Sequence, residues 1–362
     1  MSLPRIDPAA YSDQLAEKVS RFKDAFAPFA APEPAVFASA PLHYRLRAEF
    51  RVWQTDDALD YVMFDPEHPR QPIPIEHFPA AAESICELMP RLRERLQSSH
   101  TLRGSLFQAD FLATLSGELL VTLIYHRKLG PGWELAARDL ATDLNIQLIG
   151  RSRGQKVVLD RDWLLESFEL DGRTVSYQQI EGSFTQPNGN VNRQMLGWAR
   201  RQAAPLGGDL LELYCGNGNF TVALAPLFRR VLATEISKSS VHAAHYNLTA
   251  NGIDNVSLVR ASSEEISDAL AERRLLRRMA EIDLASHHFS TLFVDPPRSG
   301  LDAGTLELAA GFKHILYISC NPQTLQENVE VLKATHEIKA TAVFDQFPYT
   351  HHLECGMLLT RR

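Results

Sequence analysis

Four residues that can move protons or attack carbon stand at the ends of apolar runs. Glu235, Asp295 and Cys320 each close or directly follow such a run, and Glu354 stands just before the last one. Short apolar runs bounded by turn residues predict buried strands. The carboxyl ends of parallel strands share one edge of a sheet, and ligands of open α/β sheets bind there. We therefore expect these carboxylates and this thiol to lie in one site.

A glycine-rich turn follows the predicted strand at 209–214, in the sequence LLELYCGNGNF of residues 210–220. Gly216 and Gly218 let the backbone turn sharply and approach a ligand closely. Glu235 ends the next predicted strand, where a carboxylate can accept both hydroxyls of a ribose. The loop lacks the third glycine of a dinucleotide fingerprint and the lysine of a P-loop. A nucleoside without phosphates, above all S-adenosylmethionine, therefore fits better than a dinucleotide. An ordinary strand–helix turn is the alternative, and Asp295 at the same edge of the sheet argues against it.

Cys320 is the candidate nucleophile. Cysteines are more often inert core residues, but the strand before this one ends at Ser319, and Pro322 prevents its continuation. A helix beginning near Thr324 is expected to favour the thiolate. Glu354 is the candidate base, the alternative being a solvated side chain at a strand start.

A methyl donor, a thiol and a base together suit one reaction, the methylation of a pyrimidine at C5. This carbon is a poor nucleophile until a thiolate adds to C6 and places negative charge across C5 and O4. A base must then remove the C5 proton so that the thiol can leave. Methylation of an exocyclic nitrogen needs no cysteine.

The other cysteines and histidines do not predict a metal centre. The four cysteines have no short spacing, so a disulfide framework, a structural zinc site and an iron–sulfur cluster are not supported. Cys86, Cys215 and Cys355 are expected to pack in the interior. His351 and His352 look like a metal pair, but neighbouring residues on a strand point to opposite faces.

The second half of the chain alternates strands with helices. The seven expected strands are 209–214, 231–235, 256–260, 291–295, 314–319, 339–345 and 356–360. This alternation predicts a mostly parallel, doubly wound sheet of the Rossmann-like α/β class. The last two strands are separated by about ten residues, which is too short for a helical crossover, so the final strand is expected to run antiparallel.

The first half has a different pattern. Tyr11, Leu15 and Phe22 belong to an amphipathic helix expected within residues 1–30, which is followed by a proline-rich stretch at 28–41. Further on, strands are expected near 43–53, 61–64, 106–115, 118–126 and 145–150, with a helix near 80–96. Strands close together without intervening helices predict antiparallel α+β structure. We therefore expect an N-terminal α+β domain of residues 1–180 and a catalytic domain of residues 181–362.

The composition is that of a globular cytoplasmic protein. The 362 residues are 45% hydrophobic and 22% charged, with a net charge of -7. No apolar stretch approaches the ~20 residues of a membrane span, and the N-terminus is too polar for a signal peptide. The acidic total by itself argues mildly against a nucleic-acid partner.

Five motifs together resemble the RNA uracil-5-methyltransferases, most of all their tRNA branch. They are SFTQPN (183–188), LELYCGNGNF (211–220), FVDPPRSGL (293–301), ISCNP (318–322) and FPYTHHLEC (347–355), and HYRLRAEFRVW (43–53) extends the resemblance over nearly the whole chain. The resemblance implies a class I methyltransferase that uses S-adenosylmethionine to convert uridine 54 of the tRNA T-loop to 5-methyluridine. It also implies action on transfer-messenger RNA, with no obligate protein partner. The cysteine spacing of cluster-bearing ribosomal-RNA members is absent, which favours the tRNA branch.

The resemblance also implies roles for individual residues. Cys320 is the nucleophile and Glu354 the proton acceptor. The positions that contact S-adenosylmethionine are Gln186, Tyr214, Asn219, Glu235 and Asp295. A ribosomal-RNA uracil-5-methyltransferase and a non-catalytic protein that binds or folds tRNA are the alternatives.

Binding of an RNA substrate requires aromatic and basic residues on the surface of the N-terminal domain. The target base must be flipped out of its stack, and the exposed bases need aromatic partners. The candidates are Phe50, Trp53, Phe107 and Phe184, with Phe107 preferred, although buried aromatic residues usually serve the core. Basic residues cluster despite the acidic total, and phosphate binding needs only a local basic surface. The clusters are Arg45, Arg47 and Arg51; Arg151, Arg153 and Lys156; and Arg127 with Lys128. A charged strand face is the alternative for each.

Overall fold

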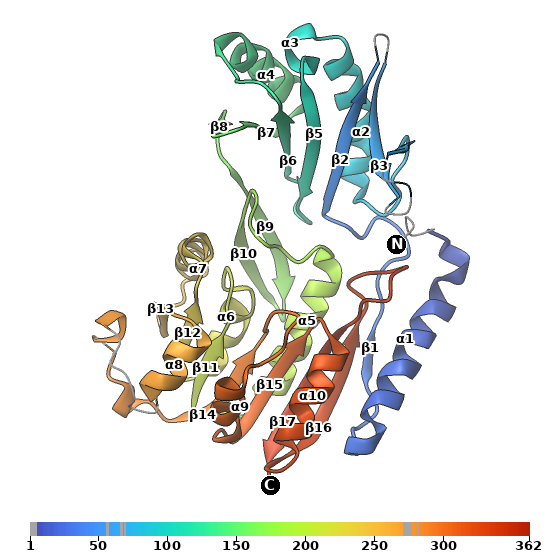
Figure 1. The fold of residues 1–362 in the computed structure, drawn as a ribbon. Coiled ribbons are helices and arrows are strands. Elements are labelled where there is room, and N and C mark those ends of the chain that lie inside the picture. The colour runs from blue at the N-terminus through green and yellow to red at the C-terminus, as the bar shows by residue number, and fades with distance from the viewer. Residues whose placement is uncertain (1–5, 56–57, 66–67, 69, 271–276, 281) are drawn as a thin grey trace. The chain divides into compact units, whose positions relative to one another are not determined.

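The computed structural model describes residues 6–362 except 56–57, 66–67, 69, 271–276 and 281 (Figure 1). Two compact units are present. The first comprises Ala40–Ser167 and Gln179–Gly189 with the N-terminal stretch up to Ala9, and the second comprises Ala10–Ser39, Phe168–Gln178 and Asn190–Arg362. The sequence led us to expect one boundary at residue 180, whereas the structure groups two earlier segments with the second unit. The N-terminal segment is tied to the second unit by the pairing of Ala35–Phe37 with Ala342–Phe344 and by the burial of Phe22 and Phe26 in that unit's core. Periodicity cannot reveal partners so far apart in the sequence.

An eight-stranded sheet forms the centre of the second unit. Its spatial order is β1-β16-β17-β15-β14-β11-β12-β13. The strands are β1 (Ala35–Phe37), β11 (Asp209–Leu213), β12 (Arg230–Glu235), β13 (Val256–Arg260), β14 (Phe289–Val294), β15 (His314–Ser319), β16 (His336–Phe344) and β17 (Glu354–Arg361). All pairings are parallel except those of β17, which runs antiparallel to β15 and β16. The α/β class and the antiparallel last strand are thus confirmed.

The eighth strand corrects the expected count of seven. β1 pairs with β16 at the edge of the sheet, yet its three residues lie in the proline-rich stretch and are exposed or half-buried. Such a strand has no hydrophobic alternation to detect. Along the sheet, the order reverses between β11 and β14, which is the topological switch point where ligands of such sheets bind.

Seven helices accompany this sheet. They are α1 (Tyr11–Phe26), α5 (Gly189–Ala203), α6 (Asn219–Leu224), α7 (Lys238–Ala250), α8 (Ser263–Leu270), α9 (Ala303–Ala310) and α10 (Pro322–Leu332) in the described part of the chain. The predicted N-terminal helix is confirmed as α1, which lies beside β1 (Figure 1) and buries Phe22 and Phe26 in the core of the second unit. Burying each aromatic side chain contributes about 1.5–3 kcal/mol.

The first unit contains a seven-stranded sheet of order β4-β3-β2-β5-β6-β7-β8. Its strands are β2 (Arg47–Gln54), β3 (Leu59–Phe64), β4 (Pro72–Pro74), β5 (Leu106–Ala113), β6 (Leu119–Tyr125), β7 (Gln147–Ser152) and β8 (Gln155–Val158). The helices α2 (Glu83–Gln97), α3 (His100–Arg103) and α4 (Pro131–Leu144) supply the other half of its core (Figure 1). A two-stranded ribbon of β9 (Trp163–Leu170) and β10 (Arg173–Ile180) is divided between the two units.

The expectation of a wholly antiparallel sheet was wrong at one pairing. β6 and β7 are parallel, because α4 carries the chain between them as a crossover. The local signals of α4 are Pro131 in its first turn and Asn145 at its C-cap, with a φ of 53°.

Residues of β2 alternate between the core and the outer face of the sheet. Arg47, Arg51 and Trp53 therefore lie on the face away from the helices. No helix in the described ranges has the length and apolarity that crossing a membrane requires.

Candidate active site

Strand pairing brings Cys320 and Glu354 together. β15 and β17 pair in antiparallel register with Ser319 opposite Cys355. Cys320 directly follows Ser319, the last residue of β15, and Glu354 is the first residue of β17, directly before Cys355. Glu354 is also one of the groups that raise the pKa of Cys320. The two residues expected to act as nucleophile and base therefore lie at the same end of the β15–β17 ladder.

Burial raises the pKa of each acidic group of this site. The pKa of Glu354 is raised to about 8 by burial and by Asp295, against the opposing charge of Arg298. Burial likewise raises the pKa of Asp295 to about 7. The pKa of Cys320 is raised to about 11 by burial, then by Glu354 and Asp295, and Arg298 again opposes the shift. Two carboxyls that titrate near neutral pH beside a thiol are typical of acid–base and nucleophilic chemistry.

The expected activation of the thiol by a helix N-terminus was wrong. Helix α10 begins at Pro322 and is capped by Asn321, whose side chain accepts a hydrogen bond from the Gln323 amide at 3.2 Å. Cys320 precedes this cap, and its net pKa shift is upward. Desolvation and the neighbouring carboxyls therefore outweigh the helix dipole, whose effect falls off within a turn.

Hydrogen bonds fix the loop after Asp295 to the start of α10. The carbonyl of Arg298 accepts from Asn321 Nδ2 at 3.0 Å and from Thr324 Oγ1 at 3.2 Å. Gly300 has a φ of 73°, and a Cβ there would lie 2.9 Å from Asn328 Oδ1. Only glycine fits this turn without strain. The carboxyl of Asp295 and the thiol of Cys320 thus lie on loops that are held to each other.

The glycine-rich loop has the geometry of a nucleoside site. Gly216 and Gly218 have φ angles of 57° and 81°, which lets the chain turn from β11 into α6. Glu235 Oε2 accepts from the Gly216 amide at 3.0 Å, and its Oε1 accepts from the Ser237 amide at 2.6 Å. Each carboxylate oxygen retains a further lone pair for a ribose hydroxyl. This arrangement fits S-adenosylmethionine, and the expected contact of Glu235 with its ribose remains a prediction.

Two residues expected to contact the cofactor instead hold this loop in place through their side chains. The hydroxyl of Tyr214 donates to Ser263 Oγ at 2.8 Å. The amide of Asn219 exchanges two hydrogen bonds with the amide of Asn192, at 3.0 and 2.9 Å. The expected contacts of Tyr214 and Asn219 with the cofactor remain predictions.

Gln186 lies outside the second unit. It is half-buried in the segment between β10 and α5, which belongs to the first unit. Its expected contact with the cofactor also remains a prediction.

Sequence reasoning missed two buried polar residues beneath the loop. Asn247 of α7 donates from Nδ2 to the Asn217 carbonyl at 2.8 Å, and its Oδ1 accepts from the Gln178 amide at 2.7 Å. Glu212 lies within the fully buried strand β11, and burial raises its pKa to about 8. Glu212 could have been found as a charged residue within an apolar run, whereas nothing in the local pattern marks Asn247.

The outer face of the first unit's sheet carries a stack of three side chains. The Arg51 guanidinium lies 3.8 Å from the ring centre of Phe107, and the rings of Phe107 and His126 are stacked 4.1 Å apart. An irregularity in the pairing of β5 with β6 occurs at Phe107. His126 was not among the residues chosen from the sequence.

The other aromatic candidates differ in exposure. Phe50 is 1% exposed and belongs to the core, so its selection as a stacking residue was wrong. Trp53 and Phe184 are 46% and 77% exposed. Strand alternation explains the difference between Phe50 and Trp53, because their separation is an odd number of residues.

Most of the predicted basic clusters are paired within the first unit. The ion pairs are Arg47 with Glu49 at 3.0 Å, Arg151 with Glu181 at 2.6 Å and Lys156 with Asp162 at 2.7 Å. The guanidinium of Arg127 donates to the carbonyls of Gly104 and Thr101, and Arg45 Nε donates to the Arg47 carbonyl. Arg51, Lys128 and Arg153 are exposed. These three side chains are therefore the best placed of the set to meet a phosphate.

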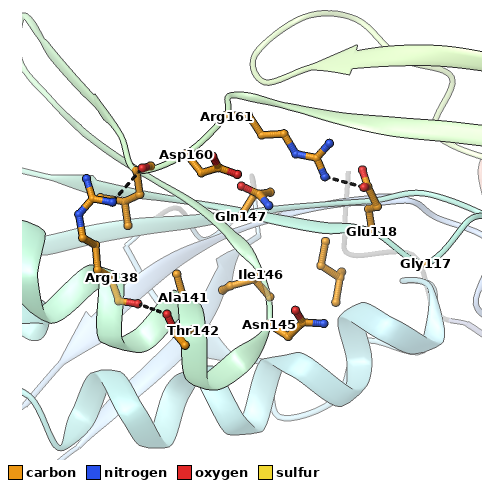
Figure 2. Close-up of a pocket in the computed structure, with 12 residues that line it drawn as sticks. Gly117, Glu118, Arg138, Ala141, Thr142, Asn145, Ile146, Gln147, Asp160 and Arg161 are labelled. Carbon is orange, nitrogen blue, oxygen red and sulfur yellow. Dashed lines mark hydrogen bonds and ion pairs between the residues drawn. The ribbon is translucent and has the colours of Figure 1, made fainter.

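A cavity of about 500 Å³ lies in the first unit beside α4 and β7 (Figure 2). Its two arginines are already engaged. Arg161 forms an ion pair with Glu118 at 2.5 Å, and Arg138 donates to the carbonyl of Leu159 at 3.0 Å. The cavity contains none of the candidate catalytic residues and is distinct from the edge at Cys320.

His351 and His352 lie in the segment before β17 rather than on a strand. Their rings are 4.1 Å apart, so the expectation that they point to opposite faces was wrong. Within the described ranges, no group of three or more histidine, cysteine or acidic side chains is arranged to hold a metal ion.

Comparison with known proteins gives consistent results. The tRNA (uracil-5-)-methyltransferase family model matches residues 10–362. The chain is 71% identical to the tRNA/tmRNA (uracil-C(5))-methyltransferase of Aromatoleum aromaticum over 100% of this chain and 98% of that protein. It is 55% identical to the enzyme of the same description from Pseudomonas entomophila, over 98% of this chain and 99% of that protein. The solved Pyrococcus abyssi tRNA (uracil-54, C5)-methyltransferase, in complex with S-adenosyl-L-homocysteine, has the same fold, with a TM-score of 0.73 at 22% identity over 97% of this chain and 83% of that one.

Proposed function

Because the chain belongs to the tRNA (uracil-5-)-methyltransferase family, we propose that it methylates C5 of uridine in tRNA and in transfer-messenger RNA. The methyl donor is S-adenosylmethionine. The observation that carries this proposal is that Cys320 and Glu354 lie at the same end of the β15–β17 ladder, in the sheet whose strand β11 leads into the glycine-rich loop. The site chosen within tRNA is uridine 54 of the T-loop.

Each residue of the site has a role in the proposed reaction. Cys320 gives up its proton to water, and Sγ forms a bond to C6 of uracil, which places negative charge across C5 and O4. S-adenosylmethionine, when bound beside Glu235, would supply the methyl group that C5 accepts and would leave as S-adenosylhomocysteine. Glu354 then takes the C5 proton, the C5–C6 double bond re-forms and the bond from Sγ to C6 breaks. Sulfur leaves as the thiolate and regains a proton from water, and Glu354 releases its proton to water, so a methyl group stands where a proton was.

The target uracil must leave its stack to reach a buried thiol. The proposed RNA surface is the outer face of the first unit's sheet, with the stack of Arg51, Phe107 and His126. An arginine and two flat rings offer both charge for phosphates and faces for unstacked bases.

The decisive test uses T-arm RNA in which uridine is replaced by 5-fluorouridine. Fluorine at C5 leaves no removable proton, so the reaction is expected to stall after methyl transfer, with Cys320 still bound to C6. With S-adenosylmethionine present, a stable protein–RNA band is expected on a denaturing gel. A band formed with a ribosomal-RNA fragment and not with the T-arm would assign the chain to the other substrate class. No band with either RNA would contradict the covalent mechanism.

Replacing Phe107 with alanine is expected to weaken RNA binding. Loss of one aromatic stacking partner costs about 1–3 kcal/mol per base, or about 5- to 150-fold in KM for T-arm RNA. Binding of S-adenosylhomocysteine, measured by calorimetry, is expected to be unchanged. The control is Leu135→Ala, which removes a side chain of α4 that is 68% exposed. Equal effects of the two variants on KM would contradict the assignment of Phe107 to the RNA surface.

The methylation rate is expected to rise with pH. Glu354 accepts a proton only when ionised, and a pKa of about 8 leaves about one tenth of it ionised at pH 7. Ionisation of Cys320, whose pKa is about 11, changes the rate in the same direction. Single-turnover rates between about pH 6 and about pH 9 should therefore climb by up to about tenfold per unit for each group. Adduct formation with 5-fluorouridine RNA reports on the thiol alone, and a flat profile for both reactions would contradict the assignment.

A further inference from the structure

A buried ion pair joins the N-terminal helix to the segment that leads into β17. Lys18 Nζ lies 2.7 Å from Asp345 Oδ1, with the two side chains 1% and 0% exposed. The same nitrogen donates to the carbonyl of Phe347 at 2.9 Å. Desolvation of two charges opposes their attraction, so a buried pair is weak evidence of a stabilising role. Neither residue takes part in the proposed methylation chemistry.

Two more contacts come from the same face of α1. Gln14 Oε1 accepts a hydrogen bond from the Tyr349 amide at 2.6 Å. The ring of Tyr11 meets the ring of Tyr349 edge to face, with the ring centres 6.0 Å apart. Lys18, Gln14 and Tyr11 follow one another at spacings of four and three residues, which places them on one face of a helix.

Tyr349 shows that this segment is held under constraint. Its φ is 61°, in the left-handed region that non-glycine residues rarely adopt. Such a conformation persists where the surroundings over-determine it, and such positions cluster at functional sites. The contact that holds its amide comes from Gln14, more than 300 residues away in the sequence.

The constrained segment ends at the proposed base. Glu354 is the first residue of β17 and pairs with Phe344, the last residue of β16. Asp345 follows Phe344 directly, so Lys18 anchors the chain one residue beyond the position opposite Glu354. The interval 345–353 is therefore fixed at Asp345 by Lys18 and at Tyr349 by Gln14.

We infer that Lys18 and Gln14 are positioning residues for Glu354, an inference that rests on the proposed function. By fixing the segment before β17, they aim the carboxyl of Glu354 at the C5 proton. Small displacements of a catalytic group slow the step that it performs. Proton removal, and not the addition of Cys320 to C6, is thus the step that depends on α1.

The test compares Lys18→Met and Gln14→Leu with the wild type in two assays. Adduct formation with 5-fluorouridine RNA measures addition to C6, and methylation of ordinary T-arm RNA measures the complete reaction. Both variants are expected to form the 5-fluorouridine adduct at close to the wild-type rate. Methylation is expected to fall by about tenfold or more, with an adduct accumulating on ordinary uridine RNA. The control is Lys23→Met, which removes an exposed lysine of α1 that pairs with the exposed Glu33.

The possible results distinguish failure of this inference from failure of the proposed methylation function. Absence of any 5-fluorouridine adduct with the wild type would contradict the proposed function itself. A normal wild-type adduct, together with equal losses in both assays for Lys18→Met and Gln14→Leu, would show a general structural role and overturn the inference. So would unchanged methylation in both variants. Gln14→Leu buries no uncompensated charge, so it keeps the test valid if Lys18→Met fails to fold, and Lys18→Arg is expected to restore methylation in part.

Discussion

Replacing Cys320 with alanine is expected to abolish both methylation and the covalent RNA adduct. Without Sγ no atom of the site adds to C6, so C5 keeps its low nucleophilicity. The expected loss of methylation exceeds about a thousandfold, as for other enzymes that lose their nucleophile. Methylation of T-arm RNA is measured with a radiolabelled methyl donor, and the adduct with 5-fluorouridine RNA on a denaturing gel.

The chain offers a matched control for this prediction. Cys86 is a half-buried cysteine of the first unit, and its thiol lies 3.3 Å from the carbonyls of Phe78 and Ala81. Cys86→Ala is expected to retain both activities. Binding of S-adenosylhomocysteine by Cys320→Ala is expected to remain normal, because the cofactor loop and Glu235 lie on other strands. Substantial methylation by Cys320→Ala would refute covalent catalysis.

Motifs identified the reactive residues, but strand pairing explains why they act together. The sequence placed Cys320 after one strand and Glu354 before another, without stating that the two strands are neighbours. The antiparallel pairing of β15 with β17 places both residues at the same end of that ladder. Glu235 was likewise predicted at a strand end, and its hydrogen bond to the Gly216 amide ties it to the loop. Residues that follow strand ends could be predicted because the hydrophobic pattern marks those ends.

Residues that act through long-range partners could not be predicted. Asn192 and Asn247 look like ordinary polar residues of helices, and their importance is visible only once they meet Asn219 and Asn217. Lys18 occupies an amphipathic helix, where a lysine is expected to face solvent. Its burial depends on Asp345, 327 residues away. The local sequence pattern around a residue does not predict a partner so far away in the chain.

The pKa of Cys320 shows a second limit of sequence reasoning. A helix N-terminus beside a thiol is visible in the sequence and predicts a lowered pKa. The desolvation and the two carboxyls that raise the pKa are visible only in three dimensions. The free enzyme therefore holds a protonated thiol, and its conversion to thiolate belongs to the reaction rather than to the resting state.

Replacing Glu354 with glutamine is expected to separate the two halves of the reaction. The pKa of Glu354 is about 8, so the native side chain is mostly a neutral acid at neutral pH. Glutamine has nearly the same shape and is also neutral, so RNA binding and the fold should be preserved. Glu354 also raises the pKa of Cys320, so removal of its ionised form favours the thiolate. Addition to C6 is therefore expected at the wild-type rate or faster.

Glutamine cannot accept the C5 proton, so the reaction is expected to stop after methyl transfer. Turnover should fall by more than about a thousandfold, and a labelled methyl group should appear in a protein–RNA band with ordinary uridine RNA. Glu337→Gln is the control, because Glu337 is exposed on β16 and pairs with Lys339 at 2.5 Å. Asp295 is the other carboxyl that raises the pKa of Cys320. Accumulation of the labelled adduct in Asp295→Asn and not in Glu354→Gln would identify Asp295, instead of Glu354, as the base.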